Sequence, residues 1–457
     1  MALFNRKQEQ KKSFAHENKT NEEALRQSTY ILELADHYKA RLLKETNLER
    51  LTSMGKAEMR QTIERLITQY MAEEKVVIPR SDKEMLLTKL INESTGLGPL
   101  EPLLEDETIT EILINGHNEV FIEKKGRLEQ TQISFRDEEH LRHIVDRIVA
   151  PLGRRIDESS PMVDARLSDG SRVNAVIPPV SLNGTLVSIR KFRKEPYSMD
   201  ELMAFDSFSP EMSKFLQALV KAKMSVLISG GTGSGKTTLL NAVAQSIPEK
   251  ERVVTIEDSA ELKLINQNVV GMEARPPNME GSGEITIRQL VKNSLRMRPD
   301  RIIVGEVRGS EAFDMLQAMN TGHEGSLTTV HANSPEDAFN RLEGMVVMAG
   351  MELPSNIIRD YIVSALDFIV QGTRLSDGTR KIVSISEIVT TEEKHVEVNE
   401  IFRFQRTGVA DDGTVLGHFT PTGVIPQCLQ RLKVYGVELE QSMFIPSEVE
   451  PHAHSHH

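Results

Sequence analysis

The sequence predicts an α/β protein in which a nucleotide-binding domain follows an α+β domain and a bundle of short helices. Residues 226–240, VLISGGTGSGKTTLL, combine a buried-strand pattern, a glycine-rich loop and the start of a helix. After this stretch, short apolar runs alternate with helical patterns, which is typical of a sheet covered by helices. Before residue 96, apolar residues recur at helical spacing alone.

The composition limits the classes of protein to consider. The chain has 457 residues, which favours about three domains. Its net charge of −12, from 55 basic and 67 acidic residues, argues against a dedicated nucleic-acid-binding protein. The single cysteine, Cys428, allows no intrachain disulfide and fits a reducing cytoplasm. No apolar run approaches the roughly 18 residues that span a bilayer, and the N-terminus lacks the apolar core of a secretory signal. We therefore expect a cytoplasmic chain that reaches a membrane only through partners.

The N-terminal region predicts a tail and a helical bundle. Residues 1–19 are polar and indicate a flexible tail, whereas residues 20–95 indicate helices. The bundle begins at a capping-box spacing, Thr20–Glu23, and continues with helices at Lys56–Glu74 and Asp82–Ser94. Such a bundle either docks a partner or only stabilises the chain, and the sequence favours neither reading.

An α+β domain is expected over residues 96–193. One helix is predicted at Glu138–Ala150, and strands are predicted at Thr110–Ile114, Val120–Glu123, Val163–Leu167, Arg172–Ile177 and Leu186–Arg190. The domain is rich in arginine, namely Arg154, Arg155, Arg166, Arg172, Arg190 and Arg193. Residues 194–206 lack a clear period and predict a linker.

A second α/β domain is expected over residues 207–425. Its later buried strands are predicted at Val253–Glu257, Arg301–Gly305 and Ser326–His331. Phe368–Leu375 and Arg380–Ile388 flank Asp377-Gly378 and predict a hairpin on the sheet edge. Residues 407–425 predict an exposed turn region, and residues 426–457 predict a C-terminal tail. The tail ends in His452, His454, His456 and His457, which favour adventitious metal binding or a tag over a physiological metal site.

The glycine-rich loop predicts a nucleoside triphosphate site. Its residues fill the G-x-x-x-x-G-K-[ST] pattern after a strand and before a helix. Glycines allow backbone N–H groups to surround a phosphate, and the helix N-terminus adds positive field. We expect Lys236 to contact the β- and γ-phosphates and Thr237 to hold Mg²⁺. The predicted contact residues are Gly230, Gly231, Thr232, Gly233, Ser234, Gly235, Lys236, Thr237 and Thr238.

Two acidic stretches follow the loop. Residues 255–261, TIEDSAE, end a strand in carboxylates that are placed either to orient or deprotonate a water or simply to face solvent. Residues 301–308 end a strand in Gly-Glu, where Glu306 is expected to reach Mg²⁺, usually through water. Arg308 follows and is a candidate sensor of the γ-phosphate.

Histidines and arginines complete the candidate set. His323 and His331 flank one predicted strand, and their spacing without cysteine disfavours zinc. His331 is either a buried structural residue or, together with His323, a link between the phosphate site and movement. A further set of arginines is predicted to be partly solvated and partly turned toward a neighbouring subunit, namely Arg275, Arg288, Arg296, Arg298 and Arg301.

These motifs together resemble the ATPases of the type II/type IV secretion superfamily. GGTGSGKTT, TIEDSAEL, RMRPDRIIVGEVRG and NTGHEGSLTTVHANSPEDAFNRLE are similar, in order, to that family's Walker A, Asp box, Walker B and His box. DARLSDGSRVNAVIPP, VSIRKF and GLGPLEPLLEDETITEILING resemble the tight-adherence (Tad/Flp) pilus motors of the CpaF/TadA type. The resemblance covers about residues 96–425.

The resemblance implies a RecA-like ATPase domain after a PAS-like α+β domain. It implies a homohexameric ring that hydrolyses ATP with Mg²⁺ to power pilus assembly, with retraction left open. The ring would act at the cytoplasmic face of the inner membrane on a membrane platform protein, without nucleic acid. By motif, the implied roles are phosphate and Mg²⁺ contacts for Lys236 and Thr237, general base for Glu261, Walker-B acid for Glu306, His-box residue for His331, and nucleotide-binding arginines for Arg172, Arg190 and Arg193.

Three alternatives stay open. Within the superfamily, the chain would be a secretion or conjugation ATPase or a retraction motor. In another class, it would be a nucleotide-dependent scaffold with little turnover, although Glu261 and Glu306 argue against that. A P-loop kinase is the third alternative, and the sequence offers no acceptor site for it.

Overall fold

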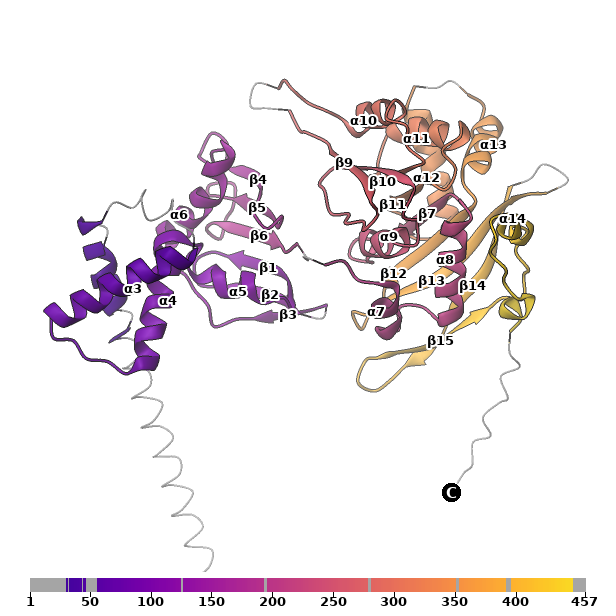
Figure 1. The fold of residues 1–457 in the computed structure, drawn as a ribbon. Helices are drawn as coiled ribbons and strands as arrows, with labels where there is room; N and C mark the ends of the chain where they lie inside the picture. Colours follow the sequence, from indigo (N-terminus) through magenta and orange to yellow (C-terminus); the bar gives the residue numbers. More distant parts are fainter. Residues whose placement is uncertain are drawn as a thin grey trace, which may run out of the picture. The chain divides into compact units, whose positions relative to one another are not determined.

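The computed structural model describes residues 30–31, 33–42, 44–46, 56–124, 126–192, 195–277, 281–350, 353–391 and 396–446. The chain divides into two compact units, Met1–Phe192 and Arg193–His457 (Figure 1). Across these described residues, no helix has the length and hydrophobicity needed to cross a membrane.

The first unit begins with helices that share one small core. Helical residues between 30 and 45 pack with α3 (Lys56–Glu73) and α4 (Arg80–Thr95). Buried members of this core include Tyr38, Leu42, Ile63, Ile67, Tyr70 and Leu90. The two helices predicted after residue 55 are confirmed, and α4 starts earlier than expected because Pro79 is its N-cap. The predicted tail and the Thr20–Glu23 capping box lie outside the described residues.

The first unit continues with a six-stranded antiparallel sheet. Its order is β3-β2-β1-β6-β5-β4, formed by β1 (Ile109–Asn115), β2 (Val120–Lys124), β3 (Arg127–Gln130), β4 (Met162–Arg166), β5 (Arg172–Val176) and β6 (Leu186–Arg190). Helix α6 (Glu138–Val149) covers one face and is capped by Asp137, which accepts from His140 N. The sequence missed β3 because all four of its residues are exposed and show no alternation. Short helical turns η1 (Gly98–Leu100), α5 (Glu101–Glu105) and η2 (Ala150–Leu152) complete this part.

The second unit is built on a nine-stranded sheet. Its order is β15-β14-β13-β12-β7-β11-β10-β8-β9, formed by β7 (Val226–Gly230), β8 (Arg252–Glu257), β9 (Asn268–Glu273), β10 (Arg301–Val307), β11 (Leu327–Val330), β12 (Phe368–Arg374), β13 (Arg380–Thr390), β14 (Val396–Val409) and β15 (Val415–Pro421). The six strands from β12 to β9 are parallel, and β13, β14 and β15 continue the sheet antiparallel. The predicted α/β fold is therefore confirmed.

Helices cover both faces of this sheet (Figure 1). On β7, Val226 and Ile228 join one core while Leu227 joins the other, as the two-residue period of a strand requires. The first core contains α8 (Pro210–Lys221) and α9 (Lys236–Ala244), and the second contains α10 (Ile287–Ser294), α11 (Glu311–Asn320), α12 (Pro335–Met348) and α13 (Ser355–Ala365). A strand buried on both sides places only its ends within reach of solvent.

Two predictions about the late strands were wrong. The β12–β13 hairpin does not lie on the sheet edge, because β12 pairs with β7 and β14 pairs with β13. Residues 407–425 are not mainly an exposed turn region, because β14 extends to Val409 and β15 returns from Val415 to Pro421. These strands read as turns since few of their side chains are buried and they give no apolar period.

The expected tail from residue 426 is also wrong as far as residue 446. Helix α14 (Leu429–Val434) and the turn η3 (Gln441–Phe444) bury Leu432 and Phe444 in the first core of the sheet. The Glu387 carboxylate accepts from the backbone N–H groups of Gln427 and Cys428 at 2.8 and 2.9 Å. Short elements of this kind lack a readable period, so only tertiary packing reveals them. The four terminal histidines lie outside the described residues.

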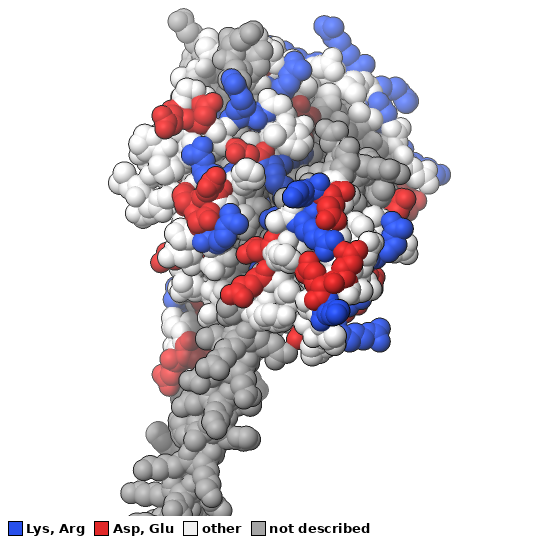
Figure 2. All heavy atoms as spheres, turned by 90° about the vertical axis from the view of Figure 1, so that its left-hand side faces the viewer, with Lys and Arg blue, Asp and Glu red and all other residues white. Residues whose placement is uncertain are grey.

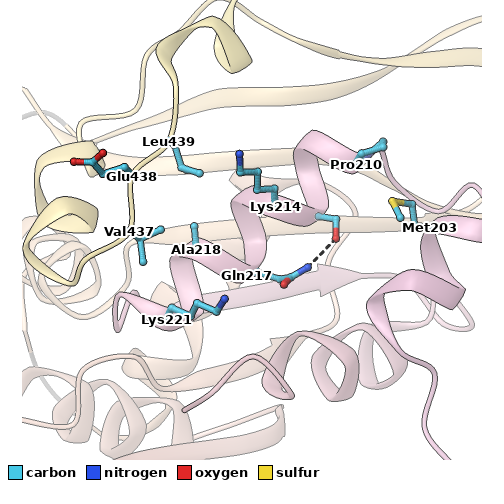
Figure 3. A pocket seen from close by; sticks show the side chains of 10 residues that line it. Met203, Pro210, Lys214, Gln217, Ala218, Lys221, Val437, Glu438 and Leu439 are labelled. Carbon is cyan, nitrogen blue, oxygen red and sulfur yellow. Dashed lines mark hydrogen bonds between the residues drawn. The ribbon is translucent and has the colours of Figure 1, made fainter.

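The stretch predicted as a linker contains a packed helix. Helix α7 (Met199–Ala204) starts with a capping box between Ser198 and Glu201. Its residues Met199 and Leu202 are buried in the core of the second unit. A shallow hollow of about 280 Å³ lies between Met203, α8 and residues 437–439, with Gln217 donating to Ser213 Oγ on its floor (Figure 3).

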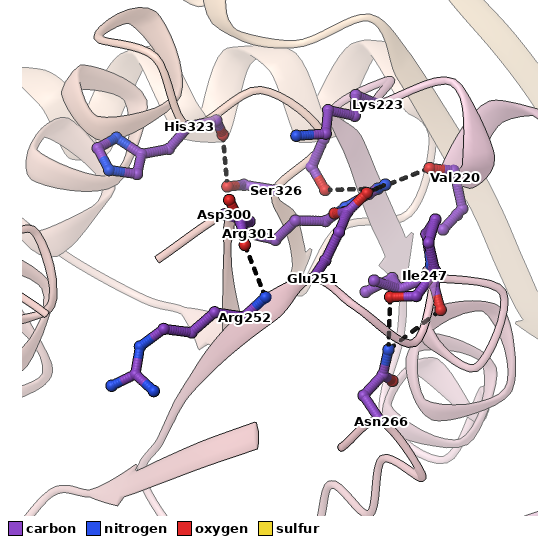
Figure 4. A network of polar contacts seen from close by, with 12 residues as sticks. Val220, Lys223, Ile247, Glu251, Arg252, Asn266, Asp300, Arg301, His323 and Ser326 are labelled. Carbon is purple, nitrogen blue, oxygen red and sulfur yellow. Dashed lines mark hydrogen bonds and ion pairs between the residues drawn. The ribbon is translucent and has the colours of Figure 1, made fainter. Parts of the chain in front are cut away.

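Arg301 is a fully buried cation at the amino end of β10 (Figure 4). Its Nε donates to Glu251 Oε2 at 2.6 Å, and its NH1 donates to the carbonyl oxygens of Val220 at 2.6 Å and Gly325 at 3.3 Å. The guanidinium thereby joins the ends of α8, β10 and the loop before β11. The expectation that some arginines of the set are solvated or face a neighbouring subunit therefore does not apply to Arg301, which is fully buried.

Replacing Arg301 with methionine is expected to destabilise the second unit by about 3–5 kcal/mol, because one partner of a buried ion pair is removed and two carbonyls lose a hydrogen bond. Calorimetric unfolding of the full chain measures the effect as a lower midpoint of the transition of this unit. Arg296→Met is the matched control, since Arg296 is exposed two residues beyond α10. Equal midpoints for the two variants would contradict the structural role given to Arg301.

Candidate nucleotide site

The predicted phosphate-binding and acidic residues converge at one edge of the second sheet. Strands β7, β11, β10 and β8 are parallel neighbours, so their carboxyl ends meet at this edge. Those ends carry, respectively, the glycine-rich loop, His331, Glu306 and Glu257. Ligands of open α/β sheets bind beyond the carboxyl ends of the strands.

The loop after β7 is shaped by its glycines. Gly233 and Gly235 adopt positive φ values of 72° and 88°. A Cβ on Gly230 would lie 2.4 Å from Ser234 Oγ and 2.6 Å from Gly372 O, so only glycine fits there. Helix α9 starts at Lys236 without a side-chain cap on its first N–H groups. Those N–H groups and the helix dipole favour an anion at this point.

Lys236 is folded over the loop. Its Nζ donates to the carbonyl oxygens of Gly230 at 3.0 Å and Gly231 at 3.1 Å. Ser234 Oγ donates to Gly231 O at 2.8 Å and tightens the turn. The ammonium group therefore lies at the mouth of the loop, where a bound phosphate would meet it.

Glu306 and Asp258 are bridged by one guanidinium. Arg308 donates from Nε to Glu306 Oε2 at 2.9 Å, and its NH1 lies 3.6 Å from Asp258 Oδ2. The backbone N–H of Arg308 is held by Glu311 Oε1 at 2.6 Å. One guanidinium thus connects the two acidic stretches, and a cation at Glu306 would compete with Arg308.

Glu257 is an acid that the sequence analysis counted in the 255–261 cluster without assigning it a role of its own. Its side chain is buried, and Oε1 accepts from the N–H groups of Glu261 at 2.8 Å and Leu262 at 3.0 Å. A Cβ on Gly305 would lie 3.0 Å from Glu257 Cγ, so glycine in β10 makes room for this carboxyl. Burial raises the pKa of Glu257 to about 7, although the two N–H donors oppose the shift. Its position as the last residue of a buried strand was the signal available in the sequence.

The raised pKa of Glu257 predicts a pH-dependent stability. The folded protein holds a proton here that the unfolded chain releases near pH 4.5, so stability falls as pH rises from about 4.5 to about 7. The full loss is about 3 kcal/mol, since each tenfold change in proton affinity corresponds to about 1.4 kcal/mol. Glu257→Gln keeps an acceptor for both N–H groups and has no charge to desolvate. We expect its thermal midpoint to exceed that of the parent chain at pH 8, with the difference shrinking toward pH 5. A difference independent of pH would contradict the assignment.

Glu261 lies in a loop that is tied to the P-loop helix. Its backbone N–H is fixed by Glu257, and the N–H of Lys263 donates to Asn241 Oδ1 of α9 at 3.1 Å. The loop therefore runs from the end of β8 to the side of α9. This places Glu261 at the same sheet edge as Glu306 and Lys236.

The two histidines do not form one site. His331 follows β11, between the strands that carry the P-loop and Glu306. His323 precedes β11 at the other edge, where Nδ1 lies 3.2 Å from Ala318 O and its carbonyl accepts from Ser326 Oγ (Figure 4). His323 therefore does not share the sheet edge that carries the P-loop, and its coupling to movement stays a prediction.

The arginines of the first unit lie in a row across its sheet. Arg172 is directly opposite Arg190 on β6 and directly opposite Arg166 on β4. Side chains directly opposite on antiparallel strands share one face, so the three guanidinium groups can meet one anion together. Arg193 lies outside the described residues. On the face drawn in Figure 2, acidic and basic side chains are interspersed.

Two other arginines of the predicted set, Arg275 and Arg288, have structural partners. Arg288 donates to Asp314 Oδ2 at 2.6 Å, linking α10 to α11. Arg275 donates from Nε to Gly283 O at 2.7 Å within its own loop. With Arg301 buried, these three stabilise the second unit directly.

Comparison with known proteins identifies two matching family models. The model described as Type II/IV secretion system protein matches residues 93–410. The model described as Type II secretion system protein E, N-terminal domain, matches residues 32–94. Together they span the described helices of the first unit, its sheet and most of the second unit.

Similar individual proteins point the same way. A Mycobacterium tuberculosis protein whose name assigns it to conjugal transfer is 37% identical over 343 residues, which is 73% of this chain and 96% of the relative. The type IV secretion system protein VirB11 of Brucella suis is 34% identical over 317 residues, which is 63% of this chain and 88% of the relative. The solved structure of the Brucella suis VirB11 ATPase in complex with sulphate covers 63% of this chain and 91% of its own, with 32% identity and a TM-score of 0.35.

The sequence matches and the sheet-edge geometry agree. A P-loop and a strand-end carboxylate beside it are recurring parts of P-loop ATPases. The chain belongs to the type II/IV secretion system protein family, and it is an ATPase.

Proposed function

We propose that this chain is a ring-forming ATPase motor that powers assembly of a tight-adherence (Tad/Flp) type IV pilus. The observation that carries ATP hydrolysis is the convergence of the P-loop, Glu306 and the acidic loop at one sheet edge. The pilus assignment rests on the strings VSIRKF and GLGPLEPLLEDETITEILING, which resemble that branch of the family.

Each site residue has a proposed role in hydrolysis. Lys236 binds the β- and γ-phosphates, and Glu261 is the general base. His331, which follows the strand between β7 and β10, responds to the presence of the phosphate. Thr237 and Glu306 hold Mg²⁺, with Glu306 acting partly through water. A hydroxyl at a helix start and a strand-end carboxylate are the oxygen ligands that Mg²⁺ prefers, and the ion would neutralise charge on the phosphates. Arg308, whose guanidinium contacts Glu306, would compete with the metal for that carboxylate and is proposed to sense the γ-phosphate.

Motion is proposed to come from the arginines of the first unit. Arg172, Arg190 and Arg193 would bring positive charge to the phosphates when ATP is bound and withdraw after phosphate release. In a homohexameric ring this cycle would do mechanical work on a membrane platform protein. The chain would then act in the cytoplasm, at the inner face of the membrane and through that partner.

Secretion or conjugation is the second candidate. The names of the Mycobacterium tuberculosis and Brucella suis relatives favour it as much as the quoted strings favour the pilus. Deleting this protein in its host distinguishes the two. Loss of surface pili with intact secretion and DNA transfer supports the pilus role, and the reverse pattern supports the second candidate.

Electron microscopy of the purified chain tests the ring. We expect six-fold rings in the presence of a non-hydrolysable ATP analogue and Mg²⁺. A monomer both with and without the analogue would contradict the proposal.

A further inference from the structure

The β12–β13 hairpin carries two arginines that border the P-loop. Arg374 ends β12, Arg380 begins β13, and the two are directly opposite each other. Arg380 donates from Nε to the carbonyl oxygen of Gly233 at 2.8 Å. A Cβ on Gly233 would lie 3.6 Å from NH1 of Arg374, and one on Gly235 would lie 3.4 Å from Cδ of Arg380. Both guanidinium groups therefore lie against the loop that surrounds the phosphate.

The strand position of Arg380 is fixed by contacts that the next two residues make. The next residue, Lys381, has a side chain only 6% exposed, and its Nζ donates to the backbone oxygen of Asp206 at 2.8 Å. The same ammonium lies 5.2 Å from the ring centre of Phe404. The N–H of Ile382 donates to Ser207 O at 2.8 Å. A side chain carried on a strand fixed in this way loses little freedom when it binds a ligand.

Sheet order tells which part of a nucleotide faces the hairpin. Strand β12 lies on one side of β7, whereas β11, β10 and β8 lie on the other. Glu306 and Glu257 therefore flank the P-loop opposite to Arg374 and Arg380. Glu306 would hold a metal ion that neutralises charge on the reacting end of the triphosphate, so the γ-phosphate would face the acids. With the β-phosphate inside the loop, the α-phosphate faces the hairpin.

We propose that Arg374 and Arg380 bind the α-phosphate and position ATP and ADP alike. The inference rests on the proposed nucleotide site and adds a subsite to it. Guanidinium groups match phosphate oxygens in geometry and charge. The α-phosphate does not react, so these contacts are equally strong before and after hydrolysis and lower KM without raising kcat.

Binding and kinetics of the full-length chain test this subsite. Arg374→Gln and Arg380→Gln are each expected to weaken ADP binding, measured by titration calorimetry, by about tenfold, which corresponds to about 1.4 kcal/mol. The KM for ATP should rise by the same factor while kcat stays within about twofold. Arg380→Lys should recover most of the ADP affinity. Arg406→Gln is the matched control, because Arg406 is an exposed strand arginine on β14.

Three results would overturn the subsite. The first is unchanged ADP affinity in both glutamine variants, and the second is a loss of affinity for ATP alone. The third is a fall in kcat as large as the rise in KM, which would mean that the arginines only shape the P-loop. Thermal unfolding without nucleotide checks that each variant folds. If Arg380→Gln does not fold, the measurements on Arg374→Gln test the subsite. Because ADP binding needs no turnover, a chain that binds ADP but hydrolyses no ATP would contradict the proposed function and still leave this subsite measurable.

Discussion

Replacing Glu306 with glutamine is expected to lower kcat for ATP hydrolysis by on the order of 10³-fold while ATP binding changes little. Glu306 lies near the end of β10, and its carboxylate is already in contact with Arg308 and, through it, close to Asp258. A neutral amide cannot hold Mg²⁺ through a bound water as a carboxylate does, so charge on the reacting phosphate is less well stabilised. Steady-state turnover and a separate nucleotide-binding titration measure the two effects.

Glu438→Gln is the control for Glu306→Gln. Glu438 is exposed and lines the hollow of Figure 3, away from the strand ends that carry the acids. Its turnover should equal that of the parent chain. If Glu306→Gln kept more than about a tenth of the parent turnover, the proposed role of Glu306 in holding the metal would be contradicted.

Replacing Arg172 and Arg190 together with glutamine is expected to lower kcat by about 10³-fold or more, the effect typical of arginines that stabilise a phosphoryl-transfer transition state. The two residues are directly opposite on β5 and β6, so one anion can meet both guanidinium groups. The double variant keeps the P-loop and both acidic stretches, and we expect its ADP affinity to stay within a few-fold of the parent value. Stopped-flow phosphate release and ADP titration measure the two quantities.

A matched change in the same unit is Arg127→Gln, on the exposed strand β3. It should leave turnover unaltered. Mixing the double variant with Lys236→Ala subunits tests whether the arginines act across a subunit boundary. Each kind of subunit lacks one half of the site, so turnover returns in the mixture only if the arginines of one subunit complete the P-loop site of another. Full activity in the double variant alone would contradict any role for these arginines in hydrolysis.

Much of the second unit could be predicted because its strands are buried on both faces. Val253–Glu257 and Arg301–Gly305 read as continuous apolar runs, and the structure places strands there. The P-loop was readable because its glycines and lysine are required by local backbone geometry. Short-range signals of this kind can be recognised in a sequence without any knowledge of tertiary contacts.

The elements that were missed depend on distant contacts. Strand β3 is exposed, β14 and β15 alternate weakly, and α14 is six residues long. Their positions are fixed by pairing with neighbouring strands or, for α14, by Asp367, which accepts from Arg431 NH1 at 2.9 Å. No window of the sequence contains both partners of such contacts.

The candidate site was predicted in its motifs but not in its supporting contacts. Glu257 was read as one carboxylate of a cluster, whereas the structure buries it and makes it the acceptor that shapes the loop of Glu261. Arg380 lies 147 residues from Gly233, and nothing local marks it as a neighbour of the P-loop. His323 was grouped with His331 by sequence distance, and a strand that crosses the sheet separates them.

Steady-state ATP hydrolysis by the purified full-length chain, with Mg²⁺ and beside Lys236→Ala, tests the central claim most directly. The claim is that ATP is hydrolysed at the sheet edge where the P-loop meets Glu306. We predict Mg²⁺-dependent turnover in the parent chain and a loss of at least about 10²-fold in Lys236→Ala. Equal turnover in the two proteins, or none in the parent chain after ring formation, would contradict it.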